Sequence, residues 1–220
     1  MTVRAATSRS RPFTAAIHAL AASRDPGCLV DLEGAILFVN DAWEQFALEN
    51  GGGARCSAAS LVGARILDHV SGEEPRRMLR MAVQRALRRG GPGARPAIQT
   101  SECNAPDVAR LVATQLAPVL AGPDVLGLTL VQRTVRQLPI QEVYQLVDGA
   151  DRDYHGDGGV LEQCSCCRRT RRPHEPEDWD FVPGLVAAPP ADTRFGYCPL
   201  CRELHYQESL APGELESGPG

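Results

Sequence analysis

The sequence contains no lysine, few aromatic residues and no long apolar segment. All 23 basic residues are arginine, which we interpret as a bias of composition and not as a site. No apolar run approaches the ~18 residues of a membrane-spanning helix, and the segment before Phe13 lacks the apolar centre of a signal peptide. The formal net charge of -4 argues against a protein built mainly to bind phosphates or anionic membranes. We therefore expect a cytoplasmic protein that has no membrane partner and does not depend on nucleic acid.

The length and the cysteine content set the next limits. A chain of 220 residues can form one large domain, or one ordinary domain with an appendage, at ~100–200 residues per domain. The hydrophobic share of 43% is enough for a core. Eight cysteines in a cytosolic protein favour metal ligands or redox thiols over a disulfide framework.

The clearest local pattern is a hairpin followed by a helix. Two short apolar strands are expected within residues 29–39, on either side of Gly34, which can take the positive φ of a tight turn. Asn40 and Asp41 supply cap oxygens for a helix, and Glu44 is spaced from Asp41 as in a capping box.

This order of strand, turn, strand and capped helix resembles the opening of a PAS domain, a small sensory module in which an antiparallel sheet cups short helices. The resemblance covers residues 12–135. It rests on the following motifs: Asp31-x-x-Gly34, Val39-Asn40, Ala42-Trp43-x-x-Phe46, Leu61-Val62-Gly63 and Leu67-Asp68-His69-Val70.

The remaining elements complete the PAS order. Residues 73–89 form the clearest amphipathic helix, with a row of arginines that we interpret as a solvated face. Three strands are expected at 97–103, 108–119 and 125–135. A short amphipathic helix over 140–147 then leaves the sheet.

The predicted fold class is α+β: a PAS-like antiparallel sheet with flanking short helices, plus a small cysteine-rich metal-binding module. The predicted organisation is a disordered N-terminus (1–11), a PAS-like domain (12–135), a short helix and linker (136–159), the cysteine module (160–207) and a disordered tail (208–220).

Two C-x-x-C pairs carry the strongest chemical signal. Cys164 and Cys167 form one pair, and Cys198 and Cys201 form the other about thirty residues later. Each pair can form a knuckle with both sulfurs facing one point, so the four thiolates predict one Zn²⁺ per chain, which would stabilise a segment with a thin apolar core. An iron–sulfur cluster also uses four thiolates, but paired knuckles around a long insert favour a mononuclear site.

The tail also resembles a cysteine-rich module that follows PAS or receiver domains in some bacterial signalling proteins, with a Cys-Ser-x-Cys, a later Trp and a Gly-x-Cys-Pro-x-Cys ending. The family commonly has a His where this chain has Phe195. Cys166 is an extra thiol within the first knuckle. It either exchanges with the metal ligands and releases metal on oxidation, or fills a position often held by other residues.

The arginines that follow the first knuckle, between Arg168 and Arg172, have two interpretations. They can stabilise thiolates whose zinc complex carries a formal charge of about −2, or they can form the nucleic-acid face of a zinc ribbon.

We predict a bacterial signal-transduction sensor or protein-interaction adaptor without enzymatic output of its own, because no catalytic triad, phosphate loop or supported carboxylate pair is found. The alternatives are a thiol redox switch and a nucleic-acid-binding zinc ribbon. The expected partners are another signalling protein and a second copy bound through the PAS-like domain. A PAS ligand, if one binds, would contact Ile36, Phe38, Trp43, Phe46, Leu67, Val83, Leu128 and Leu130.

Overall fold

A computed structural model describes residues 3–91, 93–155 and 159–209 of the chain. The chain divides into two compact units, each built from three stretches of sequence. The first unit comprises Met1–Val70, Leu79–Ile98 and Ala113–Thr134, and the second comprises Ser71–Met78, Gln99–Val112 and Val135–Gly220.

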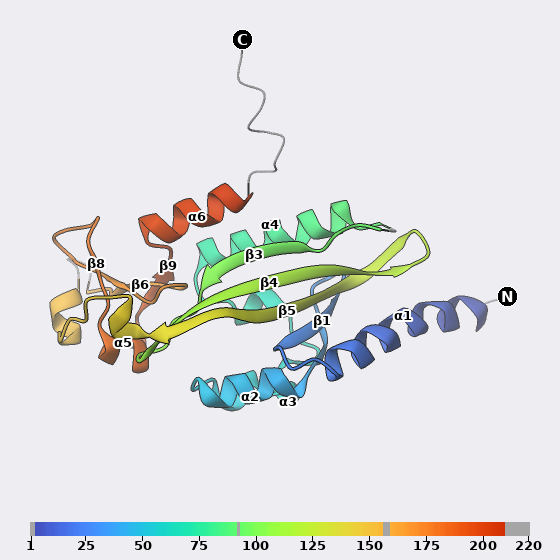
Figure 1. Cartoon of the computed structure of the whole chain (residues 1–220), viewed down its shortest axis with the longest axis horizontal. Helices are drawn as coiled ribbons and strands as arrows, with labels where there is room; N and C mark the ends of the chain where they lie inside the picture. Colours follow the sequence, from blue (N-terminus) through green and yellow to red (C-terminus); the bar gives the residue numbers. More distant parts are fainter. Residues whose placement is uncertain (1–2, 92, 156–158, 210–220) are drawn as a thin grey trace, which may run out of the picture. The chain divides into compact units, whose positions relative to one another are not determined.

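The larger sheet has five strands in the order β2-β1-β5-β4-β3 (Figure 1). Strand β1 pairs antiparallel with both β2 and β5. The strands are β1 (Gly27–Asp31), β2 (Ile36–Val39), β3 (Ala97–Glu102), β4 (Val108–Ala121) and β5 (Asp124–Pro139). The three last strands contribute residues to both units, and the predicted α+β class with an antiparallel sheet is confirmed.

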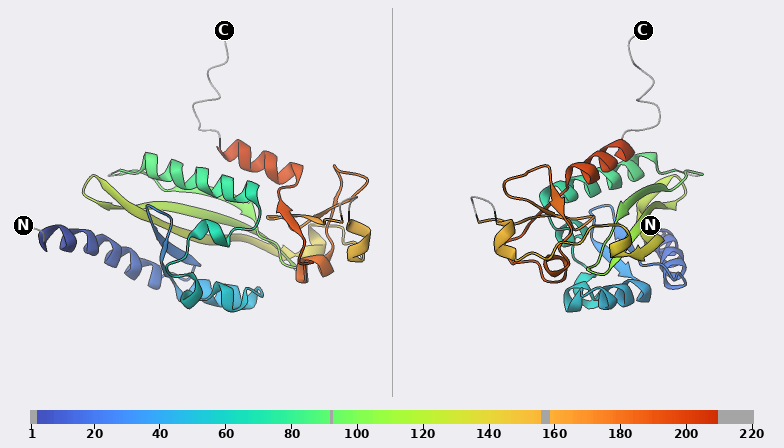
Figure 2. Two further views of the ribbon diagram at one scale, coloured as in Figure 1. Left: turned by 180° about the vertical axis from the view of Figure 1, so that it is seen from behind. Right: turned by 60° about the vertical axis from the view of Figure 1, so that its left-hand side comes forward.

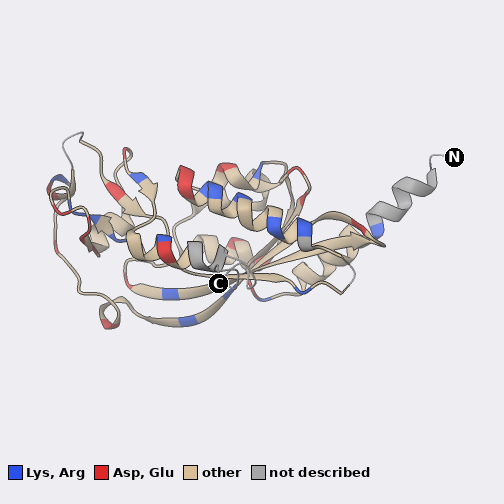
Figure 3. Ribbon diagram, turned by 90° about the horizontal axis from the view of Figure 1, so that it is seen from above, with Lys and Arg blue, Asp and Glu red and all other residues tan. Residues whose placement is uncertain are grey.

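Both long and short helices accompany this sheet. They are α1 (Val3–Ala21), α2 (Asp41–Glu49), α3 (Ala58–Leu61) and α4 (Glu73–Arg89), with 3-10 turns at Gly53–Cys56 and Ile66–His69. Helix α4 has the predicted bounds, and basic residues lie along it (Figure 3). The N-terminal segment predicted to be disordered is helical from Val3 onward, because its alanine and arginine residues favour helix.

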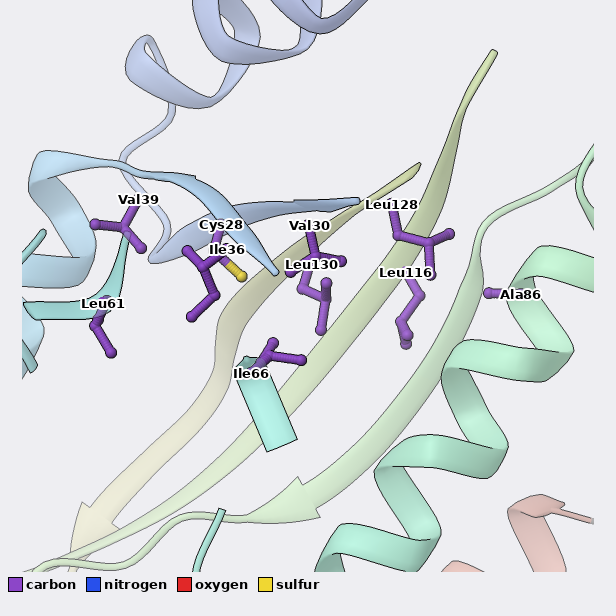
Figure 4. Close-up of a cluster of buried hydrophobic side chains, with 10 residues drawn as sticks. All are labelled: Cys28, Val30, Ile36, Val39, Leu61, Ile66, Ala86, Leu116, Leu128 and Leu130. Carbon is purple, nitrogen blue, oxygen red and sulfur yellow. The ribbon is translucent and has the colours of Figure 1, made fainter. Parts of the chain in front are cut away.

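The first unit buries side chains on both faces of its sheet. Adjacent residues of a strand point to opposite faces, so Val30 lies in a cluster with Ala86 of α4, whereas Leu29 packs with Leu20 of α1. The two helices accordingly lie on opposite faces (Figure 2). Figure 4 shows the larger cluster, which contains Cys28, Val30, Ile36, Val39, Leu61, Ile66, Ala86, Leu116, Leu128 and Leu130.

The hairpin before α2 is confirmed, but its details differ from the prediction. Gly34 has φ +80, as a tight turn requires. Asn40 alone caps α2, since its side chain accepts from the backbone N–H of Trp43 at 3.0 Å. The predicted capping box is wrong, because the Glu44 carboxylate accepts from the Ala58 N–H at 2.7 Å instead.

The second unit contains a smaller four-stranded sheet in the order β8-β7-β6-β9. Strand β6 pairs parallel with β9 and antiparallel with β7, which pairs antiparallel with β8. Its elements are β6 (Glu162–Cys164), β7 (Thr170–Arg171), β8 (Trp179–Asp180), α5 (Pro183–Ala187), β9 (Arg194–Gly196) and α6 (Pro199–Ser209).

Residues 136–159, which were predicted to form a short helix and a linker, belong to this second unit. In place of the helix over 140–147 there is one 3-10 turn, Ile140–Glu142, because Ile140 and Tyr144 pack instead against Phe181. A second 3-10 turn, Asp151–Tyr154, places the Tyr154 ring in a cluster with Leu161. The predicted tail begins within α6, and its part beyond Ser209 lies outside the described residues.

Candidate metal centre

The first knuckle follows directly from the end of β6. The Cys164 N–H donates to the Arg169 carbonyl at 2.8 Å, and the Arg168 N–H donates to the Cys164 carbonyl at 3.1 Å. These two bonds close the loop that holds Cys167. Arg168 has φ 64, a left-handed conformation that directs the chain back into β7.

The second knuckle lies at the start of α6. Cys198 precedes the helix, and Cys201 lies in its first turn. The Cys201 N–H donates to the Cys198 sulfur at 3.5 Å, and the Arg202 N–H donates to the Cys198 carbonyl at 2.9 Å. A backbone N–H group therefore faces the sulfur and stabilises it as a thiolate.

The two knuckles bring together the four cysteines predicted as ligands. Their sulfur atoms all lie within 4.8 Å of one another, and all four residues are buried. Cys167 Sγ and Cys198 Sγ are 3.7 Å apart. A regular tetrahedron with metal–sulfur bonds of about 2.3 Å has sulfur–sulfur edges of about 3.8 Å, so this set could hold a zinc-sized ion. All eight cysteines are free of disulfides.

The close sulfur contacts shift the pKa values of the thiols in opposite directions. The thiols of Cys164 and its neighbours lower the pKa of Cys198, whereas hydrogen bonds beginning with that to Cys164 raise the pKa of Cys201. Four thiolates so close together repel one another unless a cation neutralises them. The donor set therefore has the chemistry of a site for a thiophilic cation.

Arg169 supplies positive charge next to the sulfurs. Its Nε donates to Cys167 Sγ at 3.3 Å, and its NH2 group donates to Cys198 Sγ at 3.4 Å. The guanidinium also lies over the Tyr144 ring, 5.5 Å from its centroid. One side chain thus contacts a thiol from each knuckle, which matches the predicted use of arginine to stabilise thiolates.

The other arginines of the 168–172 row do not form one free cationic face. Arg171 NH1 donates to Glu162 at 2.7 Å, and Arg172 Nε donates to Asp180 at 2.7 Å. Arg168 lies over the Phe195 ring, 5.8 Å from its centroid. These contacts favour the structural interpretation of the row over the nucleic-acid face.

Cys166 faces a buried histidine, His205. Cys166 Sγ lies 3.2 Å from His205 Nε2, and both residues are buried. Gln99 contacts the other ring nitrogen of His205 at 2.7 Å, and the Tyr197 ring stacks on the imidazole with centroids 4.7 Å apart. His205 follows Cys201 by one helical turn, a spacing that could have revealed this arrangement from the sequence.

A second group missed by the sequence prediction holds the first knuckle from outside. Asn104 donates to the Cys167 carbonyl at 3.0 Å and to Glu102 at 2.7 Å, and its N–H donates to the Cys166 carbonyl at 3.4 Å. Tyr144 also donates to Glu102. No sequence signal links these residues to cysteines about sixty positions away, because only the tertiary fold brings them together.

The residues predicted to contact a PAS ligand occupy three kinds of position. Ile36, Leu128 and Leu130 are buried in the cluster of Figure 4, and Trp43, Leu67 and Val83 pack against it. Phe38 belongs to the α1 cluster on the other face, and Phe46 is half-buried outside both.

The placement of Phe38 departs from the prediction that it contacts the same ligand as Ile36. The register pairs Leu29 with Phe38 but Val30 with Ile36, so Leu37 is an extra residue in β2. Such a bulge inverts the facing of the residues beyond it. Phe38 and Ile36 therefore cannot line one cavity.

Comparison with known proteins gives similarity of structure only. No family model matches the chain, and no curated protein matches it. The PAS domain of BvgS from Bordetella pertussis is 16% identical with a TM-score of 0.36, covering 56% of this chain and 84% of that one. A variant of RsLOV is 17% identical with a TM-score of 0.40, covering 57% of this chain and 68% of that one.

A PAS domain from Colwellia psychrerythraea is 13% identical with a TM-score of 0.38, covering 56% of this chain and 96% of that one. Identities and scores this low support no statement about function. Among the described residues, no helix is both long and apolar enough to cross a bilayer.

Proposed function

We propose that this protein is a sensor or protein-interaction adaptor in bacterial signal transduction, in which a PAS-like unit is joined to a second unit organised by one Zn²⁺ ion. The observation that carries the proposal is the set of four buried sulfurs within 4.8 Å, formed in the same unit as the ends of three strands of the larger sheet. The protein would transmit a signal by contact with another protein and would catalyse no reaction itself.

Zinc suits this site because it accepts four thiolates in a tetrahedron and undergoes no redox change. Cys164, Cys167, Cys198 and Cys201 would hold it, and Arg169 would offset part of the negative charge. Two hydrophobic clusters described in this unit are small, with four and three buried side chains. Metal binding would therefore supply much of the free energy that keeps the unit folded.

The route for a signal would run through the strands shared by the two units. Residues 99–112 of β3 and β4 belong to the second unit, and Asn104 binds the carbonyl of the ligand Cys167. A structural change in these strands would thus alter the hydrogen bonding that holds the first knuckle. We further propose that the PAS-like unit forms a homodimer and that the other partner is a signalling protein.

Hydrogen exchange tests the link between the metal and the strands. Removal of the metal by a chelator, or the substitution Cys198→Ser, should raise amide exchange in residues 99–112 while residues 27–39 stay protected. Cys56→Ser is the matched control, because Cys56 lies outside the metal centre. Unchanged exchange in residues 99–112 would contradict the proposed route.

Affinity capture tests the adaptor role itself. The metal-loaded protein should retain a specific signalling protein from a lysate of its source cells, and Cys198→Ser should lose it. If wild type and variant retain the same set of proteins, the second unit is not the surface that binds the partner.

The contact between Cys166 and His205 supports a second candidate, the thiol redox switch. The Cys166 sulfur lies 3.2 Å from His205 Nε2, and an imidazolium at this position would favour the reactive thiolate. Under mild peroxide the wild type would then release metal, and Cys166→Ser would retain it. Equal retention by the two proteins would contradict the switch and leave a structural centre.

A further inference from the structure

A cavity of about 720 Å³ lies in the second unit, apart from the four sulfurs. Its volume falls within the ~300–1,000 Å³ that is common for small-molecule sites. One wall is formed by residues of the four-stranded sheet, and Glu74 and Arg202 contribute to another. The proposed function assigns no role to it.

A row of side chains crosses all four strands of the sheet and lines this cavity. Trp179 of β8 is opposite Arg171 of β7, and Glu162 of β6 is opposite Arg194 of β9. The two central strands are joined where Arg171 NH1 donates to Glu162 Oε2 at 2.7 Å. Arg194 NH1 donates to Glu162 Oε1 at 3.3 Å.

Glu162 therefore holds two guanidinium groups in place, but its single negative charge balances only one of their two positive charges. Each of its oxygens accepts from one arginine, and the three residues keep a formal charge of +1. A guanidinium has five N–H donors, so Arg171 and Arg194 retain donors beyond those that Glu162 accepts. The side chain of Arg194 is 67% exposed, and that of Arg171 is 36% exposed, so both are accessible to a ligand.

Two further polar atoms beside this row lack partners. Trp179 Nε1 and Thr193 Oγ1 are buried and form no hydrogen bond in the described structure, and both residues line the cavity. An indole N–H can only donate, so it requires an acceptor. None of the described residues supplies an acceptor within hydrogen-bonding distance of this N–H.

We propose that this cavity binds a carboxylate group. Arg171 and Arg194 would donate to the carboxylate oxygens, and the Trp179 N–H would find its acceptor in the same ligand. Trp179 lies opposite Arg171 on the same face and lines the cavity, which favours an apolar group next to the carboxylate. The carboxylate can come from a free organic acid or from the C-terminus of a peptide.

Two carboxylates of the protein would repel a carboxylate ligand. Glu73 and Glu177 belong to the same lining, where solvent and salt screen their charge. They therefore weaken the binding without abolishing it. The substitution Glu177→Gln should strengthen it.

The test uses the metal-loaded full chain with Trp43→Phe, so that Trp179 is the one remaining tryptophan. Phenylacetate should change the Trp179 fluorescence in a saturable titration, and phenylacetamide, which lacks the charge, should bind about tenfold more weakly. Arg171→Gln should weaken phenylacetate binding about tenfold. Arg152→Gln is the control, since Arg152 is highly exposed and lies outside the lining.

Arg194→Gln, at the more exposed arginine, provides a second variant if Arg171→Gln fails to fold. A peptide with a free C-terminus and an aromatic last residue, compared with its amidated form, distinguishes the two sources. Preference for the free peptide over phenylacetate assigns the site to a protein terminus, and the reverse assigns it to an organic acid. Absence of saturable binding by either, or equal binding of phenylacetate and phenylacetamide, would overturn the proposal.

Discussion

At the scale of single residues, Arg169 is the side chain on which the proposed metal centre most depends outside its ligands. It donates to one sulfur of each knuckle and is itself held over the Tyr144 ring. Arginine is suited to this position because its planar group donates in two directions at once and stays charged. The sequence shows an arginine row, but only the fold shows which member reaches the sulfurs.

Replacing Arg169 by Gln should lower the affinity for zinc by about 10-fold to 100-fold, the usual cost of losing a partner that supports metal ligands. Competition with a chromophoric chelator measures this affinity directly. Arg152→Gln serves as the control, because this exposed arginine lies outside the centre. An unchanged affinity in Arg169→Gln would mean that the guanidinium does not stabilise the thiolates.

Asp180 makes the second unit sensitive to acid. Hydrogen bonding from Arg172, followed by that from Tyr154, holds the pKa of the Asp180 carboxyl below its ordinary value. A carboxyl with a lowered folded-state pKa stabilises the fold at pH values above the unfolded pKa of about 3.9. This contribution is lost as the pH falls through the folded-state pKa.

The substitution Asp180→Asn should therefore reduce the free energy of unfolding at pH 7, and the difference from wild type should shrink as the pH falls below about 4. Denaturant titrations across this pH range measure both proteins. Asp178→Asn is the matched control, because the Asp178 side chain is 62% exposed and lies 3.9 Å from Arg172. A difference that stays constant with pH would contradict the assignment.

At the scale of secondary structure elements, Asn40 joins three segments of the first unit. Its Oδ1 accepts from Gly27 N at 2.9 Å and from Trp43 N at 3.0 Å, and its Nδ2 donates to the Leu20 and Asp25 carbonyls. The end of α1, the start of β1 and the start of α2 thus meet at one buried amide. The sequence predicted the cap of α2 but not the other three contacts of Asn40.

Asn40→Ala should lower the free energy of unfolding by about 3 kcal/mol, since it removes a helix cap and leaves buried groups without partners. Asn50→Ala is the comparison, because the exposed Asn50 side chain donates to the Phe46 carbonyl, so about 1 kcal/mol or less is expected. Urea unfolding followed by Trp43 fluorescence in a Trp179→Phe background measures both. Equal losses would show that the contacts of Asn40 do not stabilise the unit.

The sequence predicted the strands of the larger sheet and the helices α2 and α4, but neither the irregularities within them nor the strands and helices around the cysteines. Hydrophobic pattern and turn residues located the β1–β2 hairpin and all of α4. They could not locate the bulge at Leu37, because strand alternation by itself gives no sign of an inserted residue. The spacing around Ile140 suggested a helix, yet Phe181 draws these residues into another arrangement through tertiary contacts. Tertiary contacts override local helix propensity where residues far apart in the sequence bury the same side chains.

At the scale of the whole molecule, the boundary between the units does not follow the sequence. The sequence placed the end of the PAS-like domain at residue 135, and the second unit indeed takes up the chain at Val135. It also recruits residues 71–78 and 99–112, which the sequence assigned to the PAS-like domain. Glu102 and Asn104 support the first knuckle from these residues, so the four ligands could be predicted from their spacing but their support could not.

The most direct test of a metal-organised second unit is elemental analysis of protein purified without added metal, for wild type and Cys198→Ser. The proposal predicts about one zinc per wild-type chain. The variant should lose or weakly hold the metal, while Trp43 fluorescence, recorded in a Trp179→Phe background, still reports a folded first unit. Wild type without metal, or with iron in place of zinc, would contradict the proposal.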